Sequence, residues 1–420
     1  MSVSISARAI GSEDAIPQLR GDALIALAVV ALLAVRYRLP LDVPIGFIAA
    51  IAVLPVSIRY LTRFRGAFTI AGLTVVAVLG GALLTIAAEP WGRTNSSLLF
   101  AQSLRILGLG AGLAAVLWAR HLVGTRRTIL AFGLGAALSL ATTGINPDNP
   151  WKFSISLPLT LILLSLPAVY GRRMPQFLVA VLLAAVSVVF DSRSAAGFLF
   201  IAAALTLTQP RVGASPTAAR RGAVAVRVVA IAAGGFLLLQ GAILEGVLGE
   251  TLQSRTQSQI DAGGSVLTGG RPELGASLAL ISSQPLGFGS GVVPSSSQIM
   301  IAKEGMARLG YDPNNGYVEN YMFGAFFELH SLLADFWVIF GVGGLALAIA
   351  ILVFSVRGVI HSVATGAAAT VAVYLVIRMT WDFGFSPLIS SLAVLPLAIG
   401  ITLAPAPTGE ESIPHRSSGV

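Results

Sequence analysis

The chain has 420 residues, of which 55% are hydrophobic and 11% are charged, and its formal net charge is +8. Soluble globular domains carry about 25% charged residues, so this composition excludes an ordinary water-soluble enzyme. The apolar residues form blocks of about 20, the length of a helix that crosses a bilayer, and they lack the alternation of barrel strands. Because lipid offers the backbone no hydrogen bonds, the sequence predicts an all-α polytopic membrane protein.

Composition also limits the kinds of site. The positive charge does not indicate nucleic acid, because the arginines lie in short loops between apolar blocks, where membrane topology explains them. The chain has no cysteine, which excludes disulfides and thiol catalysis. Its four histidines, at positions 121, 330, 361 and 415, lack the spacing of metal ligands. We therefore expect no metal and no other cofactor.

We expect about twelve transmembrane helices in a single domain that comprises residues 1–420. They lie near residues 22–36, 43–58, 67–88, 98–119, 128–144, 153–170, 174–190, 195–208, 223–248, 331–354, 358–376 and 385–404. An even number of spans places both termini on the same side of the membrane.

The arginines predict the orientation. One set of alternate loops is the richer in positive charge: Arg59, Arg63, Arg65, Arg120, Arg126, Arg127, Arg172, Arg173, Arg211, Arg220, Arg221 and Arg227. Positive charge concentrates on the cytoplasmic side of membrane proteins, so these loops and both termini are expected in the cytoplasm.

One loop differs from the others in length. Residues 249–330, between the ninth and tenth spans, form a polar segment that the charge count places outside the cytoplasm. Loops of this length are usually functional or disordered. Its apolar stretches at 272–280 and 317–329 predict two amphipathic helices, and we expect an ordered cap over the bundle.

Arg193 follows Ser192 and precedes Ser194 at the outer start of a predicted span. An arginine, two hydroxyls and the free N–H groups of a helix N-terminus together predict a phosphate-binding site. The alternative is an interfacial arginine paired with Asp191.

Arg271 lies between Gly270 and Pro272, a pattern that predicts a tight turn followed by a helix beginning at the proline. Downstream, the glycine-rich residues 284–291 would let backbone approach a ligand, or would form only a flexible turn.

His330 lies at the outer N-terminus of the tenth predicted span. The helix dipole disfavours imidazolium there, and a neutral imidazole is suited to accept a proton from a hydroxyl nucleophile. A histidine that caps the helix or lies in the membrane interface is the alternative. Glu328 and Asp335 are candidates to orient the ring or balance its charge.

Two further arginines are candidate supporting residues. Arg105 lies about two turns inside the fourth predicted span, where an arginine needs an anionic partner, either a ligand or a carboxylate such as Glu89. Arg378 and Asp382 form a second candidate pair near the outer surface.

Taken together, three segments resemble the O-antigen ligase and polymerase family of bacterial membrane glycosyltransferases, in the family's order. The first is residues 192–196, the second is 270–274 with 285–289, and the third is 330–336 with 340–345. The long loop before His330 and the twelve-span layout are similar as well. The family often has a tryptophan where this chain has Gly275, and an asparagine where it has Ser331.

The resemblance implies an enzyme of the bacterial inner membrane that moves a glycan from a polyprenyl diphosphate carrier to an acceptor hydroxyl on a lipid or glycan. It implies that Arg193 and Arg271 hold the diphosphate and that His330 activates the acceptor, without a metal. Two arginines are suited to stabilise the charge of a departing diphosphate, and in-line attack would invert the anomeric centre.

Three alternatives remain open on the sequence. A polysaccharide polymerase would use the same site repeatedly. A lipid or glycan transporter would carry ionisable residues near the membrane midplane, where Arg105 is the only candidate. A structural protein of an envelope complex would not need His330.

Overall fold

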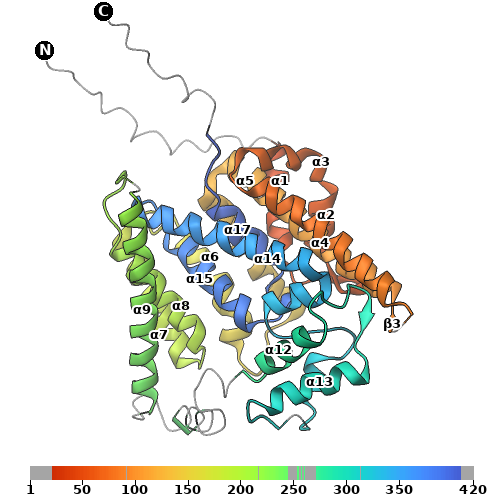
Figure 1. Ribbon diagram of the computed structural model, residues 1–420. Coiled ribbons are helices and arrows are strands. Elements are labelled where there is room, and N and C mark those ends of the chain that lie inside the picture. The colour runs from red at the N-terminus through yellow and green to blue at the C-terminus, as the bar shows by residue number, and fades with distance from the viewer. Residues whose placement is uncertain are drawn as a thin grey trace, which may run out of the picture.

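The computed structural model describes residues 21–407 except 91, 216, 245–252, 255, 256, 258, 259, 261–270 and 313. The expected cytoplasmic termini, at 1–20 and 408–420, and most of the first part of the long loop lie outside these residues. The described chain is a helical bundle with two very short two-stranded sheets, in agreement with the expected all-α class (Figure 1).

The helices of the first half are α1 (Gly21–Ala34), α2 (Ile45–Ala52), α3 (Leu54–Ser57), α4 (Ala67–Ala88), α5 (Ser96–Thr143), α6 (Ser156–Leu164), α7 (Arg173–Val189) and α8 (Arg193–Leu207). Two short 3₁₀ helices, η1 (Pro40–Asp42) and η2 (Ile58–Arg63), and one π-helical turn, η3 (Trp151–Ile155), lie between them. The strand pairs are β1 (Arg38–Leu39) with β2 (Val43–Pro44), and β3 (Arg93–Thr94) with β4 (Val292–Val293), both antiparallel.

The second half contains α9 (Ala218–Leu244), α12 (Glu273–Ser283), α13 (Ser296–Ala307), η4 (Val318–Met322), α14 (Leu332–Ala364), α15 (Thr370–Phe385), α16 (Leu388–Ser391) and α17 (Leu395–Thr402). Helices distant in sequence pack together: α14 lies along α4, α1 and α17 along α5, and α15 along α8.

The described part of the chain has membrane-spanning character. Three of its helices, α4, α5 and α14, are long and apolar enough to cross a bilayer, and α2 with the segment 54–63 makes a fourth if this pair, bent by 58°, is one span. Shorter apolar helices of 10–17 residues include α1, α7, α8 and the segment 151–164. The count of twelve spans stays a prediction.

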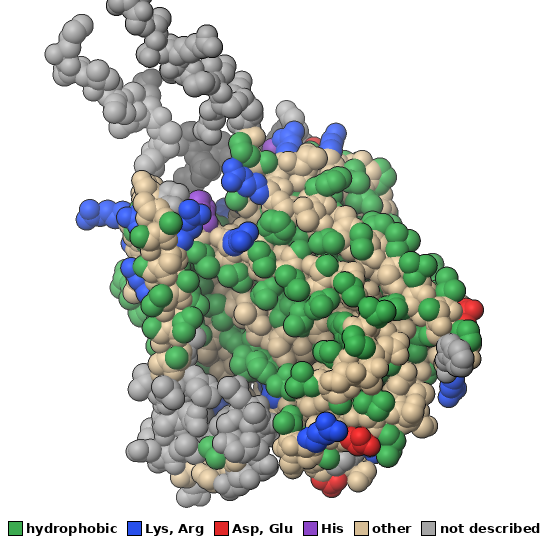
Figure 2. Space-filling view, in the orientation of Figure 1, with side chains coloured by type: hydrophobic (Ala, Val, Ile, Leu, Met, Phe, Trp, Pro, Cys, Tyr) green, Lys and Arg blue, Asp and Glu red, His purple; other side chains and the backbone are tan. Residues whose placement is uncertain are grey.

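The surface of α4 carries large apolar side chains that are exposed. Phe68, Leu79 and Leu83 are 67%, 58% and 66% exposed on this helix. A large exposed apolar area of this kind marks a surface that meets lipid or another protein. Figure 2 shows the same pattern over the whole face, where hydrophobic and uncharged side chains occupy the middle and charged ones gather toward the ends.

Several helix boundaries match the sequence analysis and others correct it. The expected third span, 67–88, coincides with α4, and the break expected between the fourth and fifth spans is a kink at Gly124 inside α5, where φ is 81°. The expected break near 355–357 is wrong, because α14 continues to Ala364 and α15 begins only at Thr370. Arg357 and His361 lie on the last turns of α14, and the chain turns instead at Gly366, whose φ is 75°.

The two helices expected in the long loop had different outcomes. The first is confirmed, since α12 begins directly after Pro272. It crosses α13 where Gly275 and Gly305 meet, and a Cβ built on either glycine would lie 2.2 Å from the carbonyl oxygen of the other. Only glycine fits at this crossing, which explains why a tryptophan is absent at 275. Figure 1 places α12 and α13 side by side at one end of the bundle.

The prediction of a second helix, at 317–329, is wrong. Only η4 is helical there, and the chain then runs irregularly to α14. Phe323, Phe327 and Leu329 are all buried, so these apolar residues point into the protein core and do not form the apolar face of a surface helix.

The glycine-rich residues 284–291 pack against helices. The N–H groups of Phe288 and Gly289 donate to the carbonyl of Val338, at 2.9 and 3.2 Å. That carbonyl lies just before a kink at Gly341 in α14, where φ is 63°, and kinks free carbonyls from their helical partners. The close approach that the glycines allow is therefore to α14, and on the other side to Thr85 of α4.

We expect Gly289→Ala to destabilise the protein. The φ of Gly289 is 123°, and a Cβ there would lie 2.6 Å from the backbone nitrogen of Thr85. Overpacking combined with an unfavourable backbone conformation costs about 2–4 kcal/mol. Thermal unfolding of the detergent-solubilised protein would show a lower Tm. Gly324→Ala is the matched control, because no atom lies within 4 Å of its built Cβ; equal Tm values for the two variants would contradict this account.

Candidate active site beside the cap

His330 lies directly before Ser331, the N-cap of α14, as the sequence predicted. Its φ is 54°, in the left-handed region that residues other than glycine rarely occupy. The ring is half-buried, and its Nδ1 atom is buried without a hydrogen-bond partner in the described chain. The imidazole therefore does not serve as a helix cap, which was one of the two alternatives for it, and a position in the membrane interface stays open.

The two neighbours of His330 are held in place by the bundle. The backbone N–H of Leu329 donates to Oδ1 of Asp335 at 2.6 Å, and the hydroxyl of Ser331 donates to the carbonyl of Phe383 at 2.8 Å. Oδ2 of Asp335 accepts from the N–H of Leu388 at 2.7 Å. Asp335 thus ties the segment before α14 to the start of α16. Strained backbone persists where surrounding contacts fix it on both sides, as they do here.

A row of charged residues leads from His330 into the bundle. Glu328 lies close enough to His330, Arg105 and Arg38 for all three to act on it electrostatically. Arg105 is buried in α5 and pairs with Asp42, with Nη2 3.0 Å from the carboxylate and 3.1 Å from the backbone carbonyl. The carboxylate partner suggested above, Glu89, is therefore not the partner of Arg105.

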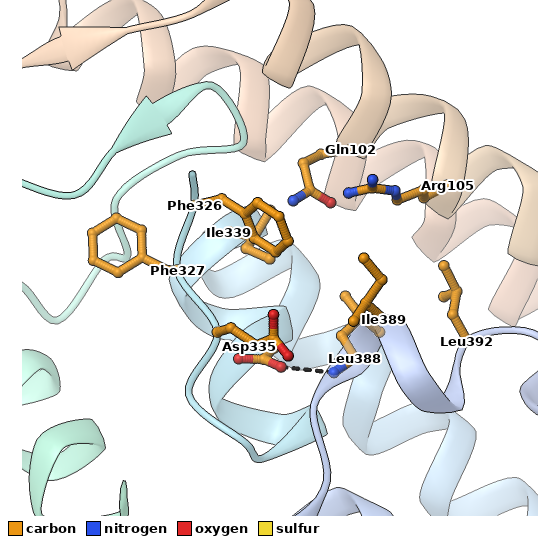
Figure 3. A pocket seen from close by; sticks show the side chains of 10 residues that line it. Gln102, Arg105, Phe326, Phe327, Asp335, Ile339, Leu388, Ile389 and Leu392 are labelled. Atoms are coloured by element: carbon orange, nitrogen blue, oxygen red, sulfur yellow. Dashed lines mark hydrogen bonds between the residues drawn. The ribbon is translucent and has the colours of Figure 1, made fainter. Parts of the chain in front are cut away.

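This row borders a small pocket between α5, α14 and α16 (Figure 3). Gln102 and Arg105 approach it from α5, and Asp335 approaches from α14 with its bond to Leu388. Phe326 closes one side, and its ring lies 5.7 Å from the guanidinium of Arg105. Glu328 and apolar side chains from 327, 339, 388, 389 and 392 complete the lining.

Arg271 lies on the cap, just before α12. Its Nη1 donates to the carbonyl of Phe385 at 3.2 Å, and its guanidinium lies 5.3 and 5.8 Å from the rings of Phe385 and Trp381. It makes no ion pair with any carboxylate of the described chain. The partners of this guanidinium are two aromatic rings and one carbonyl, which are all uncharged, so its positive charge is available to an anion. The preceding glycines at 269 and 270 lie outside the described residues.

Tyr317 joins the region of Arg271 to that of His330. Its ring centroid lies 6.0 Å from that of His330, and its hydroxyl donates to Oε1 of Glu273 at 2.6 Å. Burial first and this hydrogen bond second raise the pKa of Tyr317, while the charge of Arg271 lowers it. The phenol is therefore neutral, and the second and third sequence motifs meet at this residue.

Arg193 occupies the first turn of α8, where the sequence placed it, and its Nε lies 3.3 Å from a carboxylate oxygen of Asp191. Ser192 precedes the helix and is buried, and Ser194 is half-buried. Trp381 connects this helix to Arg271, since its ring lies 5.8 Å from that of Phe198 on α8. The sequence left two interpretations of Arg193 open, a phosphate-binding residue and an arginine paired with Asp191, and the structure contains this pair.

Arg378 and Asp382 also form the pair expected for them, with Nε 3.7 Å from Oδ2 on successive turns of α15. The other oxygen of Asp382 accepts from the hydroxyl of Ser386 at 2.7 Å. The two residues line a second small pocket, between α15 and α17, and not the one beside Glu328.

Glu328 gives the site a testable pH dependence. Burial raises its pKa above the ordinary value of 4.5, although His330, Arg38 and Arg105 oppose the rise. The folded state then binds this proton more tightly than the unfolded state, so the free energy of unfolding falls as the pH rises from about 4.5 through the folded pKa. We expect Glu328→Gln to lose this part of the dependence, so that its Tm changes less over that range. A dependence identical to that of the wild type would contradict the assignment.

The sequence did not predict Asp42 or Tyr317 as site residues, nor the contacts of Trp381 with Phe198 and Arg271. Asp42 ends the short 3₁₀ helix η1, distant in sequence from Arg105, and nothing local indicates that they pair. A weak signal existed for Tyr317, since it belongs to a segment that combines tyrosines with amides at 311–321. Within the described residues, no group of three His, Asp or Glu side chains is placed to hold a metal ion.

Comparison with known proteins found no match: no family model, no curated protein and no solved structure matches the chain.

Proposed function

We propose that the chain is an O-antigen ligase-like glycosyltransferase of the bacterial inner membrane. It has about twelve spans, both termini lie in the cytoplasm, and the site around His330 faces the opposite side. The donor is a glycan on a polyprenyl diphosphate, and the acceptor is a hydroxyl of a lipid or glycan. The proposal rests on the resemblance of the three motifs and on the chemistry of the site.

The observation that carries the proposal is that Tyr317 contacts the ring of His330 and donates to Glu273, two residues after Arg271. Arg271 supplies a positive charge that no described carboxylate neutralises. His330 supplies an imidazole whose Nδ1 has no hydrogen-bond partner in the described chain. A glycosyl transfer from a diphosphate needs these two properties at two ends of one sugar: a cation at the leaving group and a base at the acceptor.

The reaction follows from these roles. The acceptor oxygen attacks the anomeric carbon, and its proton passes to the imidazole of His330. The bond between the anomeric carbon and the diphosphate oxygen breaks, and the lipid diphosphate leaves with the electron pair. Its charge is stabilised by Arg271 and by Arg193, and attack opposite the leaving group inverts the anomeric centre.

Arg193 and Arg271 enter this reaction differently. Arg193 is paired with Asp191 at 3.3 Å, so a diphosphate would compete with that carboxylate. Arg271 has no such competitor among the described residues, which makes it the stronger anchor for the leaving group. A guanidinium that stacks on rings keeps its fork of N–H donors oriented, which suits the oxygens of a phosphate.

The test is a transfer assay with purified protein, a polyprenyl-diphosphate-linked glycan and an envelope extract as acceptor, in EDTA. We expect transfer without added metal. A single product on a gel would identify a ligase, and a ladder of lengths would identify a polymerase. Absence of transfer from several donors would overturn the proposal, and counterflow of the donor in vesicles would then identify a transporter.

A further inference from the structure

The segment 311–321 carries three tyrosines that contact one another beside His330. The rings of Tyr311 and Tyr317 lie 6.1 Å apart at an angle of 68°, and those of Tyr317 and Tyr321 lie 5.5 Å apart at 30°. Tyr321 is 64% exposed, while Tyr311 and Tyr317 are half-buried. The outermost ring thus presents most of its surface to the surroundings, and the innermost contacts His330 at 6.0 Å.

Polar side chains surround these rings. Asn314, Asn315, Glu319 and Asn320 are all exposed on the same segment. The amide of Asn315 donates to the hydroxyl of Tyr311 at 2.8 Å, whereas the side chain of Asn320 makes no hydrogen bond to the rest of the described chain. Amides donate and accept hydrogen bonds, and carboxylates accept them, so this surface combines flat apolar faces with hydrogen-bonding groups at their edges.

The segment is also fixed to the rest of the cap. Lys303 of α13 forms an ion pair with Glu319 and donates to Asn314 at 3.4 Å, and Tyr317 donates to Glu273 of α12. The ion pair lowers the pKa of Glu319, so its carboxylate is charged. A surface held at three points loses little conformational freedom on binding a ligand.

We infer that Tyr311, Tyr317 and Tyr321, with Asn320 at their edge, bind a sugar ring of the transferred or accepting glycan. One face of a pyranose carries C–H groups that pack on the electron-rich face of an aromatic ring, and its hydroxyls point outward to amides and carboxylates. The inference rests on the proposed function, and it adds a carbohydrate subsite between the diphosphate end, at Arg271, and the base.

An exposed tyrosine of a membrane protein is often an interfacial anchor, and the experiment separates the two roles. The variant is Tyr321→Ala, because its exposed ring is removed without opening the core. We expect the KM for one substrate to rise about tenfold, with kcat changed by less than about twofold. Varying the donor and the acceptor in turn identifies whose sugar the tyrosines bind. Tyr321→Phe, which keeps the stacking face, should behave as the wild type.

Met300→Ala is the matched control, since this side chain of α13 is 57% exposed on the same cap. Transfer with unchanged KM values in Tyr321→Ala would overturn the subsite and leave the proposed function standing. If the wild type transfers nothing, a second measurement tests the subsite. The glycan is released from the donor by mild acid, and its binding is measured by saturation-transfer NMR. Signal in the wild type that is lost in Tyr321→Ala would support the subsite alone, and no signal in the wild type would overturn it.

Discussion

His330→Ala is expected to lower the rate of glycan transfer by about 10²–10⁴-fold, the usual contribution of a general base. The imidazole of His330 would no longer accept the proton of the acceptor hydroxyl. The measurement is kcat in the purified system at saturating donor and acceptor. Binding of the donor should change little, because Arg193 and Arg271, which we propose to hold the diphosphate, remain.

Two variants guard this result against a folding artefact. His330→Gly also removes the imidazole, and glycine relieves the cost of the φ of 54°. It should therefore be at least as stable as His330→Ala and equally inactive. His361→Ala, at the far end of α14, should retain full activity. Wild-type kcat in both variants at position 330 would remove His330 from the mechanism.

Arg271→Ala is expected to lower kcat/KM by about 10²–10³-fold, comparable to the loss of a preorganised group that stabilises transition-state charge. The loss should appear in kcat as well as in KM, because the negative charge on the diphosphate increases as the bond to the sugar breaks. Kinetics over a range of donor concentrations would separate the effect on kcat from the effect on KM.

Arg271→Lys tests whether charge alone is sufficient. Lysine keeps the charge but not the planar fork that stacks on Trp381 and Phe385, so we expect it to recover only part of the activity. Arg308→Ala removes an exposed arginine from the end of α13 on the same cap and should have no effect. An equal loss in Arg308→Ala would indicate a general effect of positive charge on the cap and not a specific contact.

The sequence predicted the positions of some residues of the candidate site at helix starts, but it did not predict all of their partners. Arg271 before a helix, Arg193 in the first turn of α8 and His330 at the start of α14 were placed correctly, because proline and the hydropathy of the following residues mark helix starts locally. The partner of Arg105 was missed, since Asp42 reaches it only after α5 has packed beside η1.

The sequence by itself determined that this is an all-α chain with helices apolar enough to cross a membrane, because hydropathy and helix length are properties of continuous segments. It also identified most of the charged residues that gather beside the cap. Only the tertiary structure decided which of them meet. Tyr317 joins His330 to the region of Arg271, Asp335 fixes Leu329 to hold His330 in its strained conformation, and Gly275 lets α12 cross α13. These contacts link segments far apart in the chain, and their geometry depends on packing that no local pattern encodes.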